Sequence, residues 1–357
     1  MVLSVRPILL CLVSALLFGA ATPLSKQLLE PLGGLALASL LYLGAAIAVL
    51  PLCFTRSATN SRTTRKQLGF LLGAIVFGGI LGPILLLFGL AQSSAASVAL
   101  WLNLEAVATA LLAWVFFREF VGRRTWMAVA LVVVAGIVLS AGDLKSELIP
   151  GLLVAGACIC WGLDNNFSSL IDGFTPEQST LVKGVVAGSF NLVLAFSLSS
   201  PNWSYEVVLQ ALAVGGVCYG ASITLYIRGA QELGATRSQL LFSFAPFVGV
   251  LGAWVFLGED VQTVQIAAGV LMILGAFLLL ESNHQHKHTH QATTHTHSHR
   301  HDDAHHNKHG HPGGDKSGDG WHSHSHSHEK LSHSHQHLPD LHHRHDHESS
   351  DERSGES

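Results

Sequence analysis

Charged side chains are scarce in this sequence. Only 12% of its 357 residues are Asp, Glu, Lys or Arg, whereas 49% are hydrophobic and the mean hydropathy is +0.39. This average includes a very polar C-terminal segment, so the rest of the chain is far more apolar than a soluble globular domain. The scarcity of charge excludes a soluble protein. We expect the lipid bilayer to surround the chain, and we expect no nucleic-acid partner.

Motifs for metal-dependent or covalent chemistry are missing from the apolar part. Its five cysteines form no CxxC pair or other zinc-ligand spacing, so we expect them to serve packing. We recognise no nucleotide-binding loop, nucleophile motif or folded domain outside the membrane, so the sequence does not indicate an enzyme and requires no cofactor. Histidine is absent before residue 284. The cysteines are Cys11, Cys53, Cys158, Cys160 and Cys218.

Apolar runs close to the ~20 residues that a helix needs to cross a bilayer recur up to residue 281. The first run also has features of a secretory signal, because Arg6 precedes an apolar core. We expect it to remain as a membrane helix, since FGAATPLSK at its end has a counterpart later in the chain. The predicted spans are roughly 7–24, 32–54, 67–90, 95–117, 124–141, 149–170, 177–199, 206–227, 236–257 and 262–281.

Lys and Arg in the short loops predict the orientation, because cytoplasmic loops carry the excess of these residues. One set of alternate loops holds many of them, whereas the other holds only Lys26 and Lys145 as clear positive charges. We therefore expect both chain ends in the cytoplasm and the protein in a bacterial-type inner (plasma) membrane. The first set is Arg56, Arg62, Arg65, Lys66, Arg118, Arg123, Arg124, Arg228 and Arg237.

An internal repeat divides the apolar part into two halves of five spans. AWVFFREF at 113–120 reappears as AWVFLGED at 253–260, and WG at 161–162 matches FG at 18–19. Because five is odd, the second half must insert upside down, as in many secondary transporters. The sequence thus predicts an all-α membrane protein of ten transmembrane helices in two inverted five-helix repeats. The predicted domains are 1–144, 145–281 and a disordered cytoplasmic tail, 282–357.

These segments resemble the EamA-type permeases of the drug/metabolite transporter superfamily. The resemblance covers nearly everything up to residue 281 and implies a ten-helix permease with a central cavity, no covalent chemistry, and export or uptake of small metabolites. One departure is Ala106, where the family usually has a proline; Pro246 stands at the matching place of the ninth span. The matching segments are FGAATPLSK (18–26), NLEAVATALLAWVFFREF (103–120), CWGLDNNFSS (160–169) and SFAPFVGVLGAWVFLGE (243–259).

Glu105 falls near the middle of the fourth predicted span, about 15 Å from either end at ~1.5 Å rise per residue. An ionisable group at this depth costs roughly 2.5–3.5 kcal/mol, so it must face protein or water. One hypothesis is that Glu105 lines the cavity and binds a proton or cation coupled to the solute. The alternative is a protonated or hydrogen-bonded structural acid.

Asp164 and Lys183 form a second candidate site. They flank a turn near residues 172–176 at similar distances, so an antiparallel helical hairpin would bring them to the same depth, where they could pair. A structural ion pair and a substrate-binding role both remain open, because truncating one partner would strand the other charge in either case. The remaining candidates for the transport pathway are Asn103, Trp161, Asn165 and Asn166.

Two smaller patterns predict how one helix begins and where helices pack closely. Thr175, Pro176 and Gln178 are spaced as the N-cap, first-turn proline and capping-box partner of the seventh span. Three glycine pairs have the small-xxx-small spacing that lets membrane helices approach closely. These pairs are Gly69 with Gly73, Gly78 with Gly82, and Gly216 with Gly220.

Histidine is concentrated in the tail, where all 23 copies lie between His284 and His347. The segment lacks apolar periodicity and cannot form a core, so we expect disorder. Imidazole binds zinc, nickel and cobalt, and HxH spacing puts two rings on one side of an extended chain. The tail is therefore predicted to bind such divalent metals at several loose sites; the alternative is an inert solvated tail. The candidate ligands are His284, His286, His288, His290, His295, His297, His299, His322, His324, His326, His328, His333, His335, His337, His342, His343, His345 and His347.

Three functions fit these features. The favoured one is a permease for a small organic solute, with a tail that senses or buffers metal. The second is an exporter of divalent zinc, nickel or cobalt whose tail collects the ion at the cytoplasmic mouth. The third is a membrane-anchored metal sensor or store. The predicted spans argue against metal specificity, because they hold no histidine and no acid cluster beyond Glu105 and Asp164.

Overall fold

The structure is a computed structural model, and it divides into two compact units. The membrane unit comprises residues 1–58 and 63–282, and the tail unit comprises residues 59–62 and 283–357. The residues whose structure is described are 5–54, 65–117, 123–141, 144–168, 170–171, 174–199, 201, 203–233, 241–280, 285–290, 293–300, 321–328 and 331–336.

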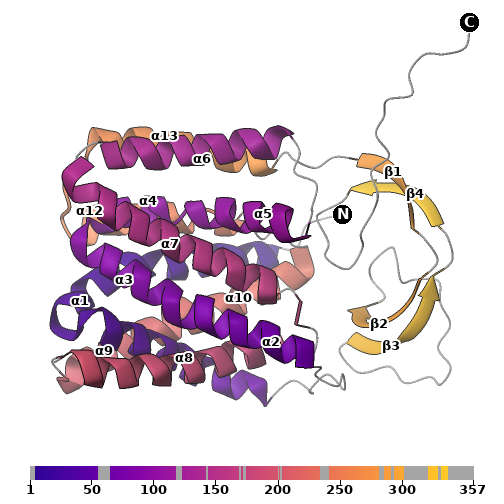
Figure 1. The fold of residues 1–357 in the computed structure, drawn as a ribbon, viewed down its shortest axis with the longest axis horizontal. Helices are drawn as coiled ribbons and strands as arrows, with labels where there is room; N and C mark the ends of the chain where they lie inside the picture. The colour runs from indigo at the N-terminus through magenta and orange to yellow at the C-terminus, as the bar shows by residue number, and fades with distance from the viewer. Residues whose placement is uncertain are drawn as a thin grey trace, which may run out of the picture. The chain divides into compact units, whose positions relative to one another are not determined.

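The membrane unit is built from long helices that lie side by side (Figure 1). α1, Val5–Cys53, contains two helical segments separated by a kink at Gly33, where φ is 71°. A side chain at this positive φ would be strained, so glycine permits the kink. The two segments of α1 correspond to the first and second predicted spans.

Helices overlap all ten predicted spans. In the described residues, seven helical segments are long and apolar enough to cross a membrane, and α12 and most of α13 are shorter apolar helices. The number of crossings and the inversion of the second half therefore remain predictions. After α1 the helices are α2 (Arg65–Ala74), η1 (Ile75–Leu81), α3 (Gly82–Gln92), α4 (Ala95–Trp101), α5 (Leu104–Phe117), α6 (Arg123–Ala141), α7 (Leu144–Ser168), α8 (Pro176–Leu198), α9 (Tyr205–Val214), η2 (Gly215–Ala221), α10 (Ser222–Leu233), α12 (Ala245–Phe256) and α13 (Thr263–Leu280).

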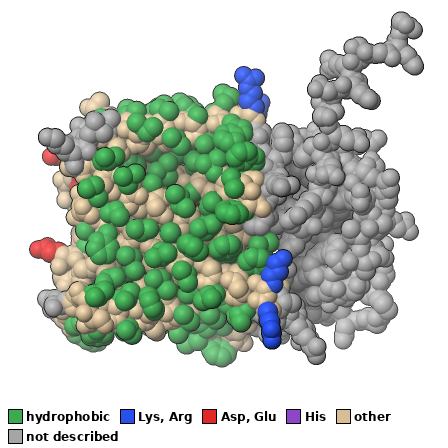
Figure 2. All heavy atoms as spheres, viewed as in Figure 1, with side chains coloured by type: hydrophobic (Ala, Val, Ile, Leu, Met, Phe, Trp, Pro, Cys, Tyr) green, Lys and Arg blue, Asp and Glu red, His purple; other side chains and the backbone are tan. Residues whose placement is uncertain are grey.

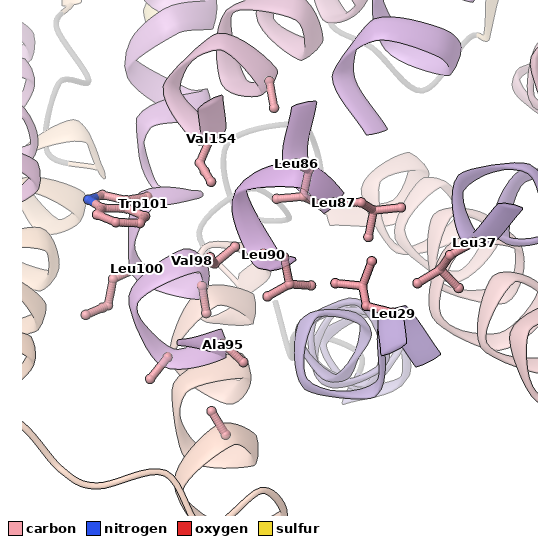
Figure 3. Packing of buried hydrophobic residues seen from close by; sticks show 14 of the residues in the cluster. Leu29, Leu37, Leu86, Leu87, Leu90, Ala95, Val98, Leu100, Trp101 and Val154 are labelled. Carbon is pink, nitrogen blue, oxygen red and sulfur yellow. The ribbon is translucent and has the colours of Figure 1, made fainter. Parts of the chain in front are cut away.

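Apolar side chains both fill and cover the membrane unit. Inside, Leu87 and Leu90 of α3 pack beside Leu37 of α1, and Trp101 at the end of α4 is only 1% exposed (Figure 3). Outside, apolar side chains cover the visible surface, with Lys and Arg at one end and Asp and Glu at the other (Figure 2). Such an extended apolar surface suits contact with lipid and would be unusual on a soluble monomer.

Two stretches of π-helix occupy matching places in the two halves. η1 runs from Ile75 to Leu81 between α2 and α3, and η2 runs from Gly215 to Ala221 between α9 and α10. The first and last residues of η2 each come 140 residues after those of η1. The same offset relates AWVF at 113 to AWVF at 253. The structural irregularity thus repeats with the sequence. π-helical turns are rare, and they are frequently found at functional sites.

The predictions of the capping box and of the glycine contacts are confirmed in part. The predicted capping box is confirmed: Gln178 N donates to Thr175 Oγ1 at 3.2 Å, and Thr175 N donates to Gln178 Oε1 at 3.0 Å. Close helix approach is also confirmed at Gly73, which faces the Phe167 ring, and at Gly220, which faces α1. The prediction is wrong at Gly69, where a side chain would meet open space.

The tail unit contains four short strands in two antiparallel pairs. β1 (Gln285–His290) pairs with β4 (Leu331–Gln336), and β2 (Thr293–Arg300) pairs with β3 (Trp321–His328). The expected disorder is therefore not observed in these four segments. Their alternation of His with Ser or Thr has the two-residue period of a strand, a pattern that a search for apolar periodicity overlooks. His284, His337, His342, His343, His345 and His347 lie outside the described residues.

We expect Gly220→Ala to lower the stability of the membrane unit. A Cβ at Gly220 would lie 2.9 Å from the Ala45 carbonyl oxygen and 2.8 Å from the Ala48 Cβ, so η2 must move away from α1. Overpacking of this kind costs about 1–3 kcal/mol. A thermal melt of the detergent-solubilised protein should show a lower Tm. Gly69→Ala is the matched control and should leave the Tm unchanged or raise it; equal effects of the two variants would contradict the packing argument.

Candidate functional site

η1 is the centre of a set of polar contacts inside the membrane unit. A π-helical turn holds an extra residue, which interrupts the regular ladder of backbone hydrogen bonds. The Gly78 carbonyl oxygen accepts from the Tyr42 hydroxyl of α1 and from Trp161 Nε1 of α7, the latter at 3.1 Å. The Gly79 carbonyl oxygen accepts from Asn191 Nδ2 of α8 at 3.2 Å. Side chains from three helices thus hold η1 in place.

Asp164 and Lys183 form an ion pair, the contact that their positions in the sequence allowed. Lys183 Nζ lies 2.6 Å from both carboxylate oxygens of Asp164, and Ser168 Oγ donates to Oδ1 of the same carboxylate at 3.0 Å. A side chain at Gly78 would collide with the Asp164 carboxylate, so glycine in η1 makes room for the pair. The ion pair therefore lies directly against the π-helical stretch, and both charged side chains are largely buried.

Glu105 lies where the fourth span is broken. α4 ends at Trp101 and α5 begins at Leu104, so Glu105 stands in the first turn of α5. Its Oε1 accepts from Asn165 Nδ2 at 3.0 Å, and the same amide lies 3.2 Å from Thr109 Oγ1. Glu105 is half-buried, whereas Asn165 is exposed. The acid is thus hydrogen-bonded through only one of its oxygens among the described contacts.

The second half has a similar break without the acid. Helix covers Leu241 and Phe242, a turn follows, and α12 begins at Ala245. The 140-residue offset aligns Ala245 with Glu105, so this ionisable group belongs to the first half alone. Discontinuous helices near the bilayer midplane are the usual frame of a transporter binding site, because the broken ends expose backbone groups there.

Asn166 and Asn103, which were also predicted to line the pathway, contact different helices. Asn166 Nδ2 donates to the Gly162 carbonyl at 2.7 Å and to the Thr109 carbonyl at 3.3 Å, which fastens α7 to α5. Asn103 Nδ2 donates to the Leu100 carbonyl at 2.9 Å and lies 3.5 Å from Met272 Sδ of α13. Asn103 therefore contacts α13, whereas Trp161, Asp164, Asn165 and Asn166 share α7.

Sequence reasoning missed several aromatic side chains near this cluster. Tyr42 lies 6.4 Å from Tyr219 of η2, measured between ring centroids; Phe18 lies 5.7 Å from Tyr219 and 5.3 Å from Phe242. Tyr42 itself joins this row to Gly78 and hence to the ion pair. The only sequence signal was a rare tyrosine within an apolar run. Aromatic rings beside charged groups suit the binding of a small amphipathic molecule.

Asn191 was also missed, and it has an unsatisfied oxygen. Its side chain is fully buried, and among the described residues its Oδ1 has no hydrogen-bond partner. A buried polar atom without a partner is costly, and such atoms often receive a water or another small polar group. Asn191 therefore extends the polar cluster from Asp164 and Lys183 along α8.

A separate group of hydrogen bonds joins helix termini at one end of the bundle. Glu259, just beyond α12, accepts from Ala95 N at 2.7 Å through Oε1 and from Ala96 N at 3.0 Å through Oε2. The carboxylate of the second half thus caps the α4 helix of the first half. Negative charge at a helix N-terminus is favourable because the terminal N–H groups point toward it.

Lys26 and Glu147 add to the same end of the bundle. Lys26 Nζ donates to the carbonyl oxygens of Leu90 at 2.6 Å and Ser93 at 2.7 Å, and Ser93 Oγ donates to Glu147 Oε2 at 2.6 Å. These residues connect α1, the end of α3 and the start of α7. We call the end that carries Lys26, Ser93, Glu147 and Glu259 the capped end.

An apolar bundle of membrane-length helices around a buried polar cluster defines an integral membrane protein with the architecture of a transporter. The EamA-like transporter family matches the chain twice, over residues 5–141 and 148–281, and the chain belongs to this family. The family consists of transporters and not of enzymes, as the absence of catalytic motifs led us to expect.

Relatives with curated descriptions carry transporter names or a protein name only. An uncharacterized transporter of Methanothermobacter thermautotrophicus is 25% identical over 289 residues, which cover 74% of this chain and 83% of that protein. The uncharacterized transporter YoaV of Bacillus subtilis is 27% identical over 138 residues, 36% of this chain and 45% of that protein. Protein RarD of Escherichia coli is 27% identical over 136 residues, with the same two coverages.

A solved crystal structure shares the fold. It superimposes with a TM-score of 0.58 and 15% sequence identity, and the match covers 76% of this chain and 95% of that chain. At this identity the likeness establishes the helical fold alone.

A double substitution separates the two roles that remain open for the ion pair. Lys183→Met should destabilise the protein by about 3–5 kcal/mol, because it leaves the Asp164 charge buried without its partner. Adding Asp164→Asn should restore most of that stability, as measured by thermal melting in detergent. If the pair is structural, the double variant should also regain transport in proteoliposomes. A stable but inactive double variant would assign the charges to substrate binding.

Proposed function

We propose that this protein is a secondary transporter that moves a small solute across the membrane by alternating access. The observation that carries the proposal is the placement of Glu105 at a helix break, hydrogen-bonded to Asn165 of α7. Asp164 of α7 pairs with Lys183 of α8, next to the π-helical stretch η1. Ionisable groups inside membrane helices mark solute or ion pathways, because they are too costly to retain without a role.

The repeated irregularities support two five-helix repeats that insert in opposite directions. η1 and η2 recur at one offset, the helix breaks at 102–103 and 243–244 lie close to that offset, and the family match occurs twice. Such symmetric elements allow one repeat to rock against the other around a fixed site. The solute would bind between the repeats, among Glu105, Asp164, Lys183, Trp161 and the aromatic row from Tyr42 to Phe242.

The charge distribution supports an orientation with both chain ends in the cytoplasm. Lys66, Arg123 and Arg124 are exposed at the starts of α2 and α6, which the prediction assigns to the cytoplasmic side. The capped end then faces outward, and the conformation described is closed toward the outside. An inner membrane of bacterial type is the proposed location. To release or admit solute on the outside, the hydrogen bonds from Ala95 and Ala96 to Glu259 must break.

Glu105 is proposed to couple solute movement to a proton or another cation. A half-buried carboxylate that accepts from Asn165 can exchange that donor for a proton as the site opens to water. Asn165 would hold the carboxylate toward α7 in the meantime. Asn103, which contacts Met272, would act on the pathway through the break at the start of α5.

Glu105→Gln should lower coupled transport by at least about tenfold, about 1.4 kcal/mol in the barrier, while the protein stays folded and inserted. The substitution keeps the hydrogen-bonding shape and removes the titratable group. Proteoliposomes with and without a pH gradient, tested across amino-acid-like solutes and divalent metals, provide the measurement. Glu206→Gln, which neutralises an exposed acid in the first turn of α9, is the control. Normal coupled rates in Glu105→Gln would rule out the coupling role.

Glu259→Gln should open the capped end. The substitution replaces two charge-assisted hydrogen bonds with one weaker acceptor, so the outward-closed conformation loses stability. In a background without the five cysteines, a membrane-impermeant thiol reagent should label Ser97→Cys faster when Glu259→Gln is present, since Ser97 is buried at this end. Asp260→Asn, at the exposed neighbouring position, should not change the labelling rate. Equal rates for all three proteins would show that Glu259 does not close this end.

The histidine-rich tail favours divalent metal as a second candidate substrate. Here the tail would collect zinc, nickel or cobalt at the cytoplasmic mouth for export. Within the described part of the membrane unit, no group of three or more His, Cys, Asp or Glu side chains gathers in a way that could hold a metal ion. For this reason we favour an organic solute as cargo and propose a metal-binding, regulatory role for the tail. Metal transport by the proteoliposomes just described would reverse this preference.

A further inference from the structure

The strands of the tail unit place histidine opposite histidine. In the β2–β3 pair, the register joins His295 with His326, His297 with His324 and His299 with His322. The intervening pairs, Thr296 with Ser325 and Ser298 with Ser323, contain only hydroxyl residues. In the β1–β4 pair, the register joins His286 with His335 and His288 with His333.

This register places histidine positions on one face of each pair of strands. Residues i and i+2 of a strand belong to the same face, and directly opposite residues of an antiparallel pair have Cβ atoms ~4.5–5.5 Å apart. Two successive opposite pairs therefore provide four histidine positions around one point of the sheet. Zinc in proteins takes four ligands, with Zn–N bonds of ~2.0–2.1 Å. The β2–β3 pair offers three such opposite pairs and the β1–β4 pair offers two.

The sequence of these strands raises the question of what holds them together. β2 and β3 alternate His with Ser or Thr, so neither face of the pair can bury an apolar core. Isolated two-stranded sheets are marginally stable in water at best. Metal binding to ligands from both strands would supply the missing free energy, because binding to a site that exists only in the folded state stabilises that state.

We propose that β2 and β3 form a cross-strand histidine ladder that binds a divalent transition metal, and that β1 and β4 form a second ladder. The proposal rests on the metal-binding tail proposed above and deepens it: the metal is held at defined cross-strand positions rather than at loose sites along the chain. Zinc, nickel and cobalt are the ions that these ligands favour.

The order of the strands also couples the two ladders. β2 and β3 lie between β1 and β4 in the sequence, so the outer pair encloses the inner one as nested hairpins. Closing the β2–β3 ladder brings the ends of β1 and β4 within a few residues of each other, which lowers the entropy cost of closing the outer ladder. Binding to the inner ladder thus favours binding to the outer one.

A permutation that keeps the composition tests the register. In the full-length protein in detergent, the combination His324→Ser, Ser325→His, His326→Ser and Ser327→His moves two histidines to the other face of β3. Adding His333→Ser, Ser334→His, His335→Gln and Gln336→His does the same in β4, so that neither ladder keeps its register. We expect the Zn²⁺ Kd, measured by competition with a chelating dye, to rise by at least about tenfold. We also expect the visible absorption of tetrahedral Co²⁺ to weaken when Co²⁺ is used as the probe. The matched control shifts four histidines outside the strands and should bind as tightly as the unaltered protein. Its substitutions are His306→Asn, Asn307→His, His309→Gly, Gly310→His, His345→Asp, Asp346→His, His347→Glu and Glu348→His.

The outcomes separate this proposal from the proposed function. If the permuted protein binds Zn²⁺ as tightly as the control, the ladder is wrong, although the tail still binds metal. If the unaltered protein binds no more Zn²⁺ than a variant that ends at Glu281, both the ladder and the metal-binding tail are wrong. Neither result bears on solute transport, which the Glu105→Gln experiment measures independently.

Discussion

Lipid offers no hydrogen-bond partners, and this constraint organises the candidate site. Every carbonyl that leaves a regular helix inside the membrane, and every ionisable side chain there, must find a partner on another helix. η1 frees the carbonyls of Gly78 and Gly79, and Tyr42, Trp161 and Asn191 satisfy them. Because these donors come from α1, α7 and α8, the same bonds that make the irregular helix tolerable also bring three helices to the Asp164–Lys183 pair.

The membrane unit uses two kinds of contact for two purposes. Leu87, Leu90 and Trp101 belong to a dry core that holds helices of both halves through close packing. At the capped end, by contrast, Glu259 and Lys26 hold neighbouring segments by charge-assisted hydrogen bonds. Water can replace such bonds there at small cost, whereas opening the dry core would expose apolar surface. The capped end is therefore the part of the bundle that we propose opens and closes.

Local patterns predicted more of this structure than long-range contacts did. The apolar runs located the helices, and the spacing of Thr175 and Gln178 predicted their capping box, because both depend on a few neighbouring residues. The Asp164–Lys183 pair was also predictable, since the two residues flank one turn of a helical hairpin. Tyr42 and Asn191 were not, because their partners Gly78 and Gly79 lie far away in sequence and become acceptors only through η1. Gly69 shows the reverse error, a favourable spacing at a position where an added Cβ would meet no atom of the described residues within 4 Å.

The sequence by itself determined that this chain enters a membrane, that its two halves repeat, and that histidine is confined to the tail. Composition and periodicity suffice for these conclusions, because the hydrophobic effect acts on each segment separately. Only the tertiary structure decided which carbonyls η1 exposes, which half supplies the Glu259 cap, and which histidines stand opposite one another. Each of these depends on how segments that are distant in the chain align with one another. The sequence within one segment does not determine that alignment.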